Sequence, residues 1–181
     1  MNLQSSDFEL FGVPECFTQD IQVLTGRWKQ LQREAHPDRF AAQGDAARRH
    51  AMQWSVRINE AWQRLKDPIK RAAYLCERHG APVNAENNTA MPSDFLMQQM
   101  EWREALDDAD GRNALDALTN AVTAARRDAL AALAVQIDDR RDFLAAVGQV
   151  RALMFIERFA DEVENRMDAW QDAVDVSDSR Q

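Results

Sequence analysis

The chain has 181 residues, which is enough for one large domain or two small ones with cores of their own. Its content of 45% hydrophobic and 29% charged residues excludes disordered and collagen-like proteins. A net charge of −8 disfavours nucleic-acid binding, because contacts with phosphates need clustered cations. The apolar runs are too short to cross a membrane, and Met1–Gln4 does not resemble the start of a secretion signal. We expect a cytoplasmic protein that binds neither nucleic acid nor membrane.

The content of helix breakers and cysteines narrows the class of protein further. Six glycines and five prolines interrupt a sequence rich in helix-forming residues, so an all-α fold is predicted. Cys16 and Cys76 stand alone, with no CxxC pair and no histidine at ligand spacing. A disulfide scaffold and a cysteine-rich metal site are therefore excluded, and two reduced, buried or half-buried thiols are expected.

Charge divides the chain into two units. Residues 1–82 hold 12 Lys and Arg against 10 Asp and Glu, whereas residues 83–181 hold 10 against 20. Residues 80–92 contain two prolines and three asparagines and show no apolar period, which is typical of a linker. We therefore expect a first domain at 1–80, a linker at 81–92, a second domain at 93–176 and a tail at 177–181.

The first unit is predicted to contain four short helices. The first follows Ser5–Asp7 and ends at Gly12, and Thr18 is expected to cap the second. Pro37 ends the second helix at His36, a loop runs through Gly44, and two more helices follow at 45–66 and 69–79. The second and third helices each carry an apolar stripe with spacings of 3 and 4 residues. The stripe of the second helix consists of Ile21, Leu24, Trp28, Leu31 and Ala35, and that of the third consists of Ala47, Ala51, Trp54, Ile58, Ala61 and Leu65. Such stripes predict an antiparallel helical hairpin.

The tip of this hairpin carries the tripeptide His36-Pro37-Asp38. Arg27, Lys29 and Arg33 form a cationic face on the solvent side of the second helix, next to the tip. Simple solvation is the plain alternative for that face. A histidine beside an aspartate also suggests acid–base catalysis, but no nucleophile or third partner accompanies the pair.

The arrangement of these motifs resembles a J-domain. An aromatic first helix, a basic second helix, His-Pro-Asp at the tip and a helix that ends near Asp67-Pro68 are all present, and Lys70-Arg71 resembles the basic cluster that often opens the fourth helix. The resemblance implies docking on a DnaK-type chaperone and stimulation of its ATP hydrolysis. It assigns the obligatory contact with the chaperone to His36, Pro37 and Asp38. It assigns a cationic surface that meets an acidic surface of the chaperone to Arg27, Lys29 and Arg33.

The second unit is predicted to be an antiparallel bundle of three helices. Ser93 is expected to cap the first helix, which ends before Gly111. The second carries an apolar stripe from Leu115 to Leu133, and the third follows Asp138-Asp139 and continues to about Trp170. Short connections between such helices favour antiparallel neighbours.

The first helix of this bundle carries two separate apolar stripes. Its core stripe consists of Phe95, Trp102, Leu106 and Ala109, whereas Leu96, Met97 and Met100 lie on another side, beside Glu101, Glu104 and Asp108. Phe155 lies off the core stripe of the third helix and is expected to join the second group. An exposed patch with methionines and a carboxylate rim is typical of a partner surface. The alternative is that all of these residues are core.

The whole chain except its last residues resembles the HscB family of iron–sulfur co-chaperones. The resemblance rests on Phe95–Glu101, on Leu106–Asp108, on Phe8–Gly12 and on Ile58–Trp62. It implies that the bundle binds an IscU-like scaffold protein and delivers it to an HscA-like chaperone. The apolar contact would come from Leu96, Met97, Met100 and Phe155, with Glu101, Glu104 and Asp108 around it. No metal is implied, because the CxxC zinc motifs of some eukaryotic relatives are missing. A co-chaperone that shifts its partner's conformational equilibrium implies no cofactor and no enzymatic activity of its own.

Two other readings stay open at this point. The bundle of a chaperone adaptor could hold a different client or dimerise. A small enzyme using His36 or Cys76 has little support, since the sequence has no carboxylate pair, phosphate loop or nucleophile–base motif.

Overall fold

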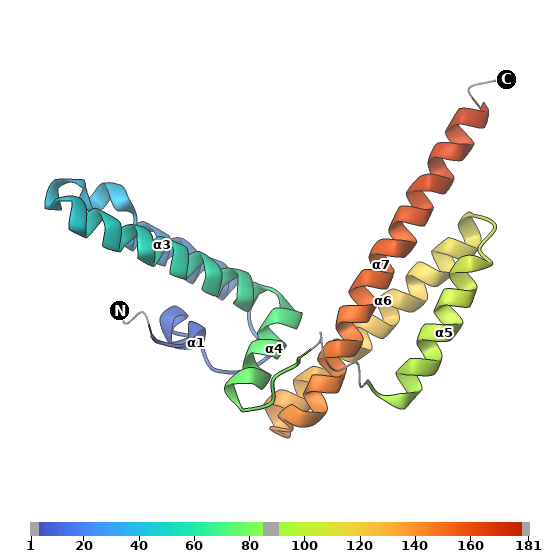
Figure 1. Ribbon diagram of the computed structural model, residues 1–181, viewed down its shortest axis with the longest axis horizontal. Helices are drawn as coiled ribbons and strands as arrows, with labels where there is room; N and C mark the ends of the chain where they lie inside the picture. The colour runs from blue at the N-terminus through green and yellow to red at the C-terminus, as the bar shows by residue number, and fades with distance from the viewer. Residues whose placement is uncertain (1–3, 85–90, 179–181) are drawn as a thin grey trace.

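The computed structural model describes residues 4–84 and 91–178, which contain helices and turns and no strand (Figure 1). The helices are α1 (Asp7–Phe11), α2 (Ile21–Glu34), α3 (Asp45–Lys66), α4 (Pro68–Arg78), α5 (Ser93–Asp107), α6 (Arg112–Ala134) and α7 (Phe143–Asp178), with a 3₁₀ helix η1 (Pro37–Gln43) and a π-helical turn η2 (Val135–Asp139). None of the helices in the described ranges meets the length and hydropathy of a bilayer-crossing segment.

Polar side chains cap the helices of the N-terminal unit. Ser6 caps α1 in a capping box with Glu9, and the carboxylate of Asp67 accepts hydrogen bonds at the start of α4. The expectation that Thr18 caps α2 is wrong, because Asp20 accepts hydrogen bonds from Gln22 and Val23 instead. Ser93 is likewise the first residue of α5 and not its cap.

The α2–α3 hairpin is closed by aromatic and amide contacts as well as by the expected apolar stripes. The rings of Trp28 and Trp62 stack with centroids 5.5 Å apart. Asn59 Oδ1 accepts hydrogen bonds from Trp28 Nε1 and Gln32 Nε2 at 3.0 and 2.7 Å. Ile21, expected in the buried stripe, is the first residue of α2 and is exposed.

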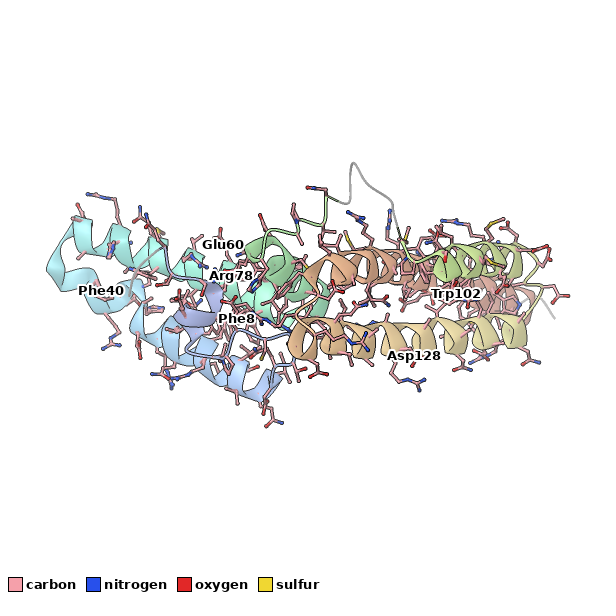
Figure 2. The ribbon with its side chains drawn as sticks, turned by 90° about the horizontal axis from the view of Figure 1, so that it is seen from below. Phe8, Phe40, Glu60, Arg78, Trp102 and Asp128 are labelled. Atoms are coloured by element: carbon pink, nitrogen blue, oxygen red, sulfur yellow. The ribbon has the colours of Figure 1, made fainter. Side chains whose placement is uncertain are left out.

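Helix α1 is held against the hairpin by a buried carboxylate. Asp7 is fully buried, and its two oxygens lie 2.6 Å from Arg57 and 2.9 Å from Arg64, both on α3. A buried carboxylate requires such partners, since its desolvation is costly when it is unpaired. Phe8, labelled in Figure 2, is buried beside it and stacks on Tyr74 of α4.

The C-terminal unit is the predicted three-helix bundle. Helices α6 and α7 form its long antiparallel pair, and α5 lies along them (Figure 1). Helix α7 continues to Asp178, well past the predicted end near Trp170, and thus includes the first residues of the expected tail. Residues 85–90 of the expected linker and 179–181 of the tail lie outside the described residues.

The two units are joined by one continuous core and by a polar clamp. The carboxylate of Asp138, in η2, accepts hydrogen bonds from the backbone N–H groups of Phe17 (2.6 Å) and Thr18 (2.9 Å). On the other side of the same segment, Arg71 Nε donates to the carbonyl of Phe17 at 2.7 Å, and another Arg71 nitrogen donates to the carbonyl of Leu65. Arg71, one of the two basic residues that open α4, is buried at this junction, so Arg71 stabilises the junction of the two units and is not presented to solvent.

A second group of contacts extends this junction. The ring of His79, at the end of α4, stacks on Phe143 of α7 with centroids 3.9 Å apart. The carboxylate of Glu15 lies 2.8 Å from the guanidinium of Arg78 and 3.2 Å from Nε2 of His79. The hydrogen bond from Arg78 lowers the pKa of the Glu15 carboxyl. Arg151 Nε of α7 donates to the carbonyl of Val83 at 2.9 Å, which fastens the first part of the linker.

We expect Asp138→Ala to lower the free energy of unfolding by about 2 kcal/mol, because it removes a charged acceptor from two backbone donors. The measurement is urea unfolding followed by far-UV circular dichroism. Asp139→Ala, at the exposed neighbouring position, is the matched control and should stay within about 0.5 kcal/mol of the wild type. Equal midpoints for the two variants would contradict the role of Asp138 as a clamp.

Candidate functional site

The tripeptide His36-Pro37-Asp38 lies at the free end of the α2–α3 hairpin, far from the bundle (Figure 1). Pro37 occupies the first position of η1, where its missing N–H is not needed, and His36 is the N-cap. His36 Nδ1 accepts a hydrogen bond from the backbone of Asp38 at 3.3 Å and lies 3.6 Å from Asp38 Oδ2. The histidine side chain is 57% exposed and that of the aspartate 90%, so both are presented to solvent.

The backbone around the tip holds these side chains in place. The Arg39 guanidinium donates to the carbonyl of Arg33 at the end of α2, at 3.2 Å, and Ser55 Oγ of α3 donates to the carbonyl of Ala35 at 3.1 Å. Phe40 faces the hairpin and lines a hollow together with Trp54 (Figure 2 labels Phe40). The bend is thus fixed from both helices, and His36 and Asp38 keep a defined orientation.

The cationic face lies along α2 next to this tip, and all three of its members are exposed. Arg27 donates to Gln30 at 3.3 Å, and its guanidinium lies close to Gly12. Lys29 and Arg33 form no ion pair with any residue that the structure describes. A surface of unneutralised cations attracts an acidic partner surface and sets the rate and register of the encounter.

His36 and Cys76, the two residues considered for acid–base or nucleophilic catalysis, lack the surroundings that such catalysis needs. His36 is solvated and its carboxylate neighbour is more exposed still. Cys76 is fully buried, and burial raises the pKa of its thiol to about 11, so it is a neutral thiol at physiological pH. In the described ranges no three His, Cys, Asp or Glu side chains are grouped so that they could hold a metal ion.

The second candidate surface is the apolar patch of α5, which consists of Leu96, Met97 and Met100. Their exposed fractions are 46%, 67% and 74%, so the expectation of an exposed second stripe agrees with the geometry. Large apolar side chains clustered in solvent are typical of a surface that binds a partner. The thioether side chains of methionine adapt to irregular contacts.

An aromatic cluster beneath α5 sets the orientation of this patch. Trp102 (Figure 2) is buried and stacks on Phe159 of α7 with centroids 5.5 Å apart. Phe95 meets Phe155 edge to face at 5.7 Å. With these rings turned toward α7, the side of α5 that carries Met97 and Met100 has to face solvent.

Phe155 does not lie on the exposed patch, and that part of the expectation is wrong. It is 8% exposed, stacks on Phe159, and has the guanidinium of Arg103 over its ring at 5.5 Å. The helical angle placed it off the stripe that faces α6, but α5 covers α7 from that other direction. Phe155 therefore belongs to the support of α5 and not to the exposed surface.

The carboxylates beside the patch are exposed as predicted. Glu101, Glu104 and Asp108 all lie on the solvent side of α5, and Gln98 donates to Glu101 at 3.2 Å. This rim is negative, whereas the α2 face is positive. The two candidate surfaces thus differ in sign as well as in position, and Figure 1 places them toward opposite ends of the molecule.

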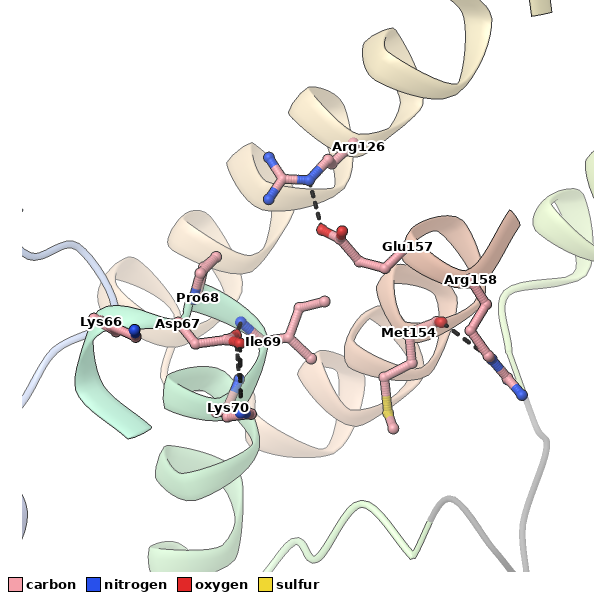
Figure 3. A pocket seen from close by; sticks show the side chains of 9 residues that line it. All are labelled: Lys66, Asp67, Pro68, Ile69, Lys70, Arg126, Met154, Glu157 and Arg158. Carbon is pink, nitrogen blue, oxygen red and sulfur yellow. Dashed lines mark hydrogen bonds and ion pairs between the residues drawn. The ribbon is translucent and has the colours of Figure 1, made fainter. Parts of the chain in front are cut away.

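A cleft of 590 Å³ lies between the two units (Figure 3), at the junction of α3 and α4 with α6 and α7. Its charged groups are largely paired with one another, as Arg126 with Glu157 at 2.6 Å and Lys70 with Asp67 at 4.0 Å. The cleft is lined by Lys66, Asp67, Pro68, Ile69, Lys70, Arg126, Met154, Glu157 and Arg158. None of these lining residues is a serine, cysteine or histidine. No nucleophile–base pair of serine, cysteine or histidine is therefore present among these lining residues.

Comparison with known protein families identifies the second unit. Residues 91–164 match the family model described as the HSCB C-terminal oligomerisation domain. The chain is 49% identical over 166 residues to a co-chaperone protein HscB homolog from Burkholderia mallei, across 90% of this chain and 94% of that one. It is 47% identical over 170 residues to the homolog from Paraburkholderia phymatum, across 92% and 97%.

Solved structures of similar proteins have the same fold. The chaperone HscB from Vibrio cholerae is 40% identical and superposes with a TM-score of 0.79, over 91% of this chain and 99% of that chain. Human co-chaperone protein HscB superposes with a TM-score of 0.84 over 92% and 84%, at 23% identity, which shows a shared fold. These likenesses extend over both units of the chain.

We expect Phe155→Ala to destabilise the protein by about 3–4 kcal/mol, because it removes a buried ring from a packed aromatic cluster. Met97→Ala, which truncates an exposed side chain on the same surface of the bundle, should change the free energy of unfolding by less than about 0.5 kcal/mol. Urea unfolding of both variants measures the difference. A small effect of Phe155→Ala would restore that residue to the exposed patch.

Proposed function

The chain belongs to the HscB family of co-chaperones, and from that premise we propose that it couples an iron–sulfur scaffold protein to a DnaK-type chaperone. Its fold is a J-domain joined to an antiparallel three-helix bundle. We propose that the J-domain docks on an ATP-bound, HscA-like chaperone and stimulates ATP hydrolysis. The bundle binds an IscU-like scaffold and presents it to that chaperone, which aids cluster transfer.

The observation that supports this proposal is the separation of two unlike exposed surfaces on one joined body. One consists of His36, Pro37 and Asp38 with the cationic face, and the other of the apolar patch with its carboxylate rim. A ligand bound at one end leaves the other end accessible (Figure 1). Simultaneous binding raises the effective concentration of the scaffold at the chaperone, so two modest affinities suffice.

We assign the chaperone contact to the tip and the α2 face, and the scaffold contact to the patch. Arg27, Lys29 and Arg33 would steer an acidic surface of the chaperone onto α2, in a weak and salt-sensitive complex. Leu96, Met97 and Met100 would be covered by the scaffold, with Glu101, Glu104 and Asp108 around the apolar contact. Phe155 supports that surface from beneath.

The protein contributes no chemical step in this scheme. It acts by binding one conformation of its chaperone partner better than the other, which is the only way a ligand can shift such an equilibrium. We place it in the cytoplasm, in keeping with the free cysteines Cys16 and Cys76.

We expect Asp38→Asn to abolish the stimulation of ATP hydrolysis by an HscA-like chaperone, because it removes the exposed negative charge from the tripeptide. Steady-state phosphate release measures the effect, and binding of the scaffold should be unchanged. Glu60→Gln, which also removes one negative charge from an exposed side chain but on α3, is the matched control and should stimulate ATP hydrolysis as the wild type does. Full stimulation by Asp38→Asn would remove the proposed role of the tripeptide.

We expect the triple variant Leu96→Ser, Met97→Ser and Met100→Ser to bind an IscU-like scaffold about 100-fold more weakly, because the buried centre of the interface supplies most of its affinity. Isothermal titration calorimetry measures the change.

The matched control for this experiment replaces three exposed apolar side chains elsewhere, Met52, Val56 and Leu144, with serine. This control should bind the scaffold within about twofold of the wild type, if the patch is specific. Equal losses in the two triple variants would contradict the assignment of the patch. A wild-type protein that stimulates the chaperone but does not bind the scaffold would favour a different client.

A further inference from the structure

The side of the α6–α7 pair that faces away from α5 carries an open groove. Its volume is 390 Å³, and its floor includes the buried Val122 and Val163 and the partly exposed Ala160 and Met167. The residues of α7 that meet α5 or its side chains are Phe155, Phe159 and Glu162. At 100° per residue, the groove residues of α7 lie roughly 140° around the helix from these. The groove is therefore separate from the patch on α5.

The apolar floor continues beyond the groove along α7. Val163, Met167 and Trp170 follow one another at spacings of 4 and 3, and thus share one side of the helix. Met167 and Trp170 are both partly exposed. Figure 1 shows α7 running past the turn that joins α5 to α6, so this part of the stripe extends beyond the bundle. Most of it also lies beyond residue 164, where the match to the family model ends.

A row of exposed carboxylates runs along α7, and two of its members, Glu164 and Asp168, line the groove. Asp161, Glu164, Asp168 and Asp172 occur at spacings of 3, 4 and 4, which places them within about 80° of one another on α7. Asp116, which is ion-paired with Arg112 at 3.6 Å, lines the opposite side of the groove. The only Lys or Arg between residues 159 and 178 is Arg166, which lies about 120° or more around α7 from each of these carboxylates and flanks the apolar stripe on the side of Trp170. The border of the groove formed by Glu164 and Asp168 is thus negative, whereas Arg166 flanks the apolar stripe on its other side.

We propose that this face binds a basic amphipathic helix of a partner protein, with apolar side chains in the groove and lysines or arginines against the carboxylates. Helix-in-groove recognition has the period of 3 and 4 that both rows show. A second copy of the same face is disfavoured, because a two-fold contact would oppose one acidic row to another. An anionic lipid surface is disfavoured for the same reason.

The probe is a synthetic helical peptide with leucines at spacings of 3 and 4 and lysines on its flanks, titrated into the full-length protein. The control peptide has glutamate in place of lysine. We expect the lysine peptide to bind, the glutamate peptide not to bind, and the affinity to fall with added NaCl, because exposed charges are screened. Binding of both peptides with equal affinity would overturn the proposal.

Charge variants test whether the acidic row itself is the site. The variant Asp161→Asn, Glu164→Gln, Asp168→Asn and Asp172→Asn should weaken binding of the lysine peptide about tenfold. The matched control neutralises four exposed carboxylates elsewhere, through Asp107→Asn, Asp110→Asn, Asp128→Asn and Glu60→Gln, and should bind within about twofold of the wild type. Equal losses would mean that net charge alone attracts the peptide, which would overturn the proposal.

Apolar variants distinguish this face from the patch on α5, which also has an acidic border. Met167→Ser should weaken binding of the lysine peptide, and Met97→Ser should not. The reverse result would place the peptide on α5 and overturn the proposal. Sedimentation velocity of the wild type gives the remaining outcome: a dimer that Met167→Ser dissociates would place a second copy on this face and would also overturn it.

Discussion

The segment Phe17–Thr18 is the point on which the relative placement of the two units depends. Its N–H groups donate to Asp138 of the bundle, and the carbonyl of Phe17 accepts from Arg71 of the J-domain. Backbone groups with no partner would be costly at this partly buried place. The buried backbone of Phe17 therefore depends on both side chains, whereas the exposed N–H of Thr18 adds a second hydrogen bond to Asp138. The stacked rings of His79 and Phe143 add an apolar contact to the same junction.

The bundle uses a different interaction to present its surface. Four rings, those of Phe95, Trp102, Phe155 and Phe159, decide which side of α5 is turned inward. Exposed methionines on the opposite side are a consequence of that packing, since each helical residue can face only one direction. The packed side of α5 thus serves stability, and the proposed function assigns recognition to its exposed side. A substitution of one of the four aromatic residues tests the stability of the bundle, whereas a substitution of an exposed methionine tests the proposed binding of a partner.

The sequence predicted most helix boundaries because local chemistry determines them. Pro37, Asp67-Pro68 and Gly80 interrupt helices whatever the tertiary structure is, and α3 has the predicted bounds. The position of the tripeptide at the hairpin tip followed from the same local rules.

Contacts between distant segments could not be read from the sequence. Asp138 seemed to be an ordinary residue before a helix, although it bonds to residues about 120 positions away, and the burial of Arg71 depends on the same junction. Phe155 was misplaced because a helical angle relative to one neighbour, α6, does not show where a second neighbour, α5, will lie. Amphipathic periodicity defines the sides of a helix but not which of several sides another helix covers.

A junction that fixes the units relative to each other has a consequence for binding at two ends. The gain in effective concentration is lost when the geometry prevents both partners from binding at once, and it falls as the connection becomes longer. A flexible tether would have to order on binding, whereas a clamped junction is ordered beforehand. In the proposed function, the tripeptide and the apolar patch could therefore each be small, exposed and weakly binding. The net charges of the two units would reinforce this division, because an acidic partner would be attracted to α2 and repelled by the bundle.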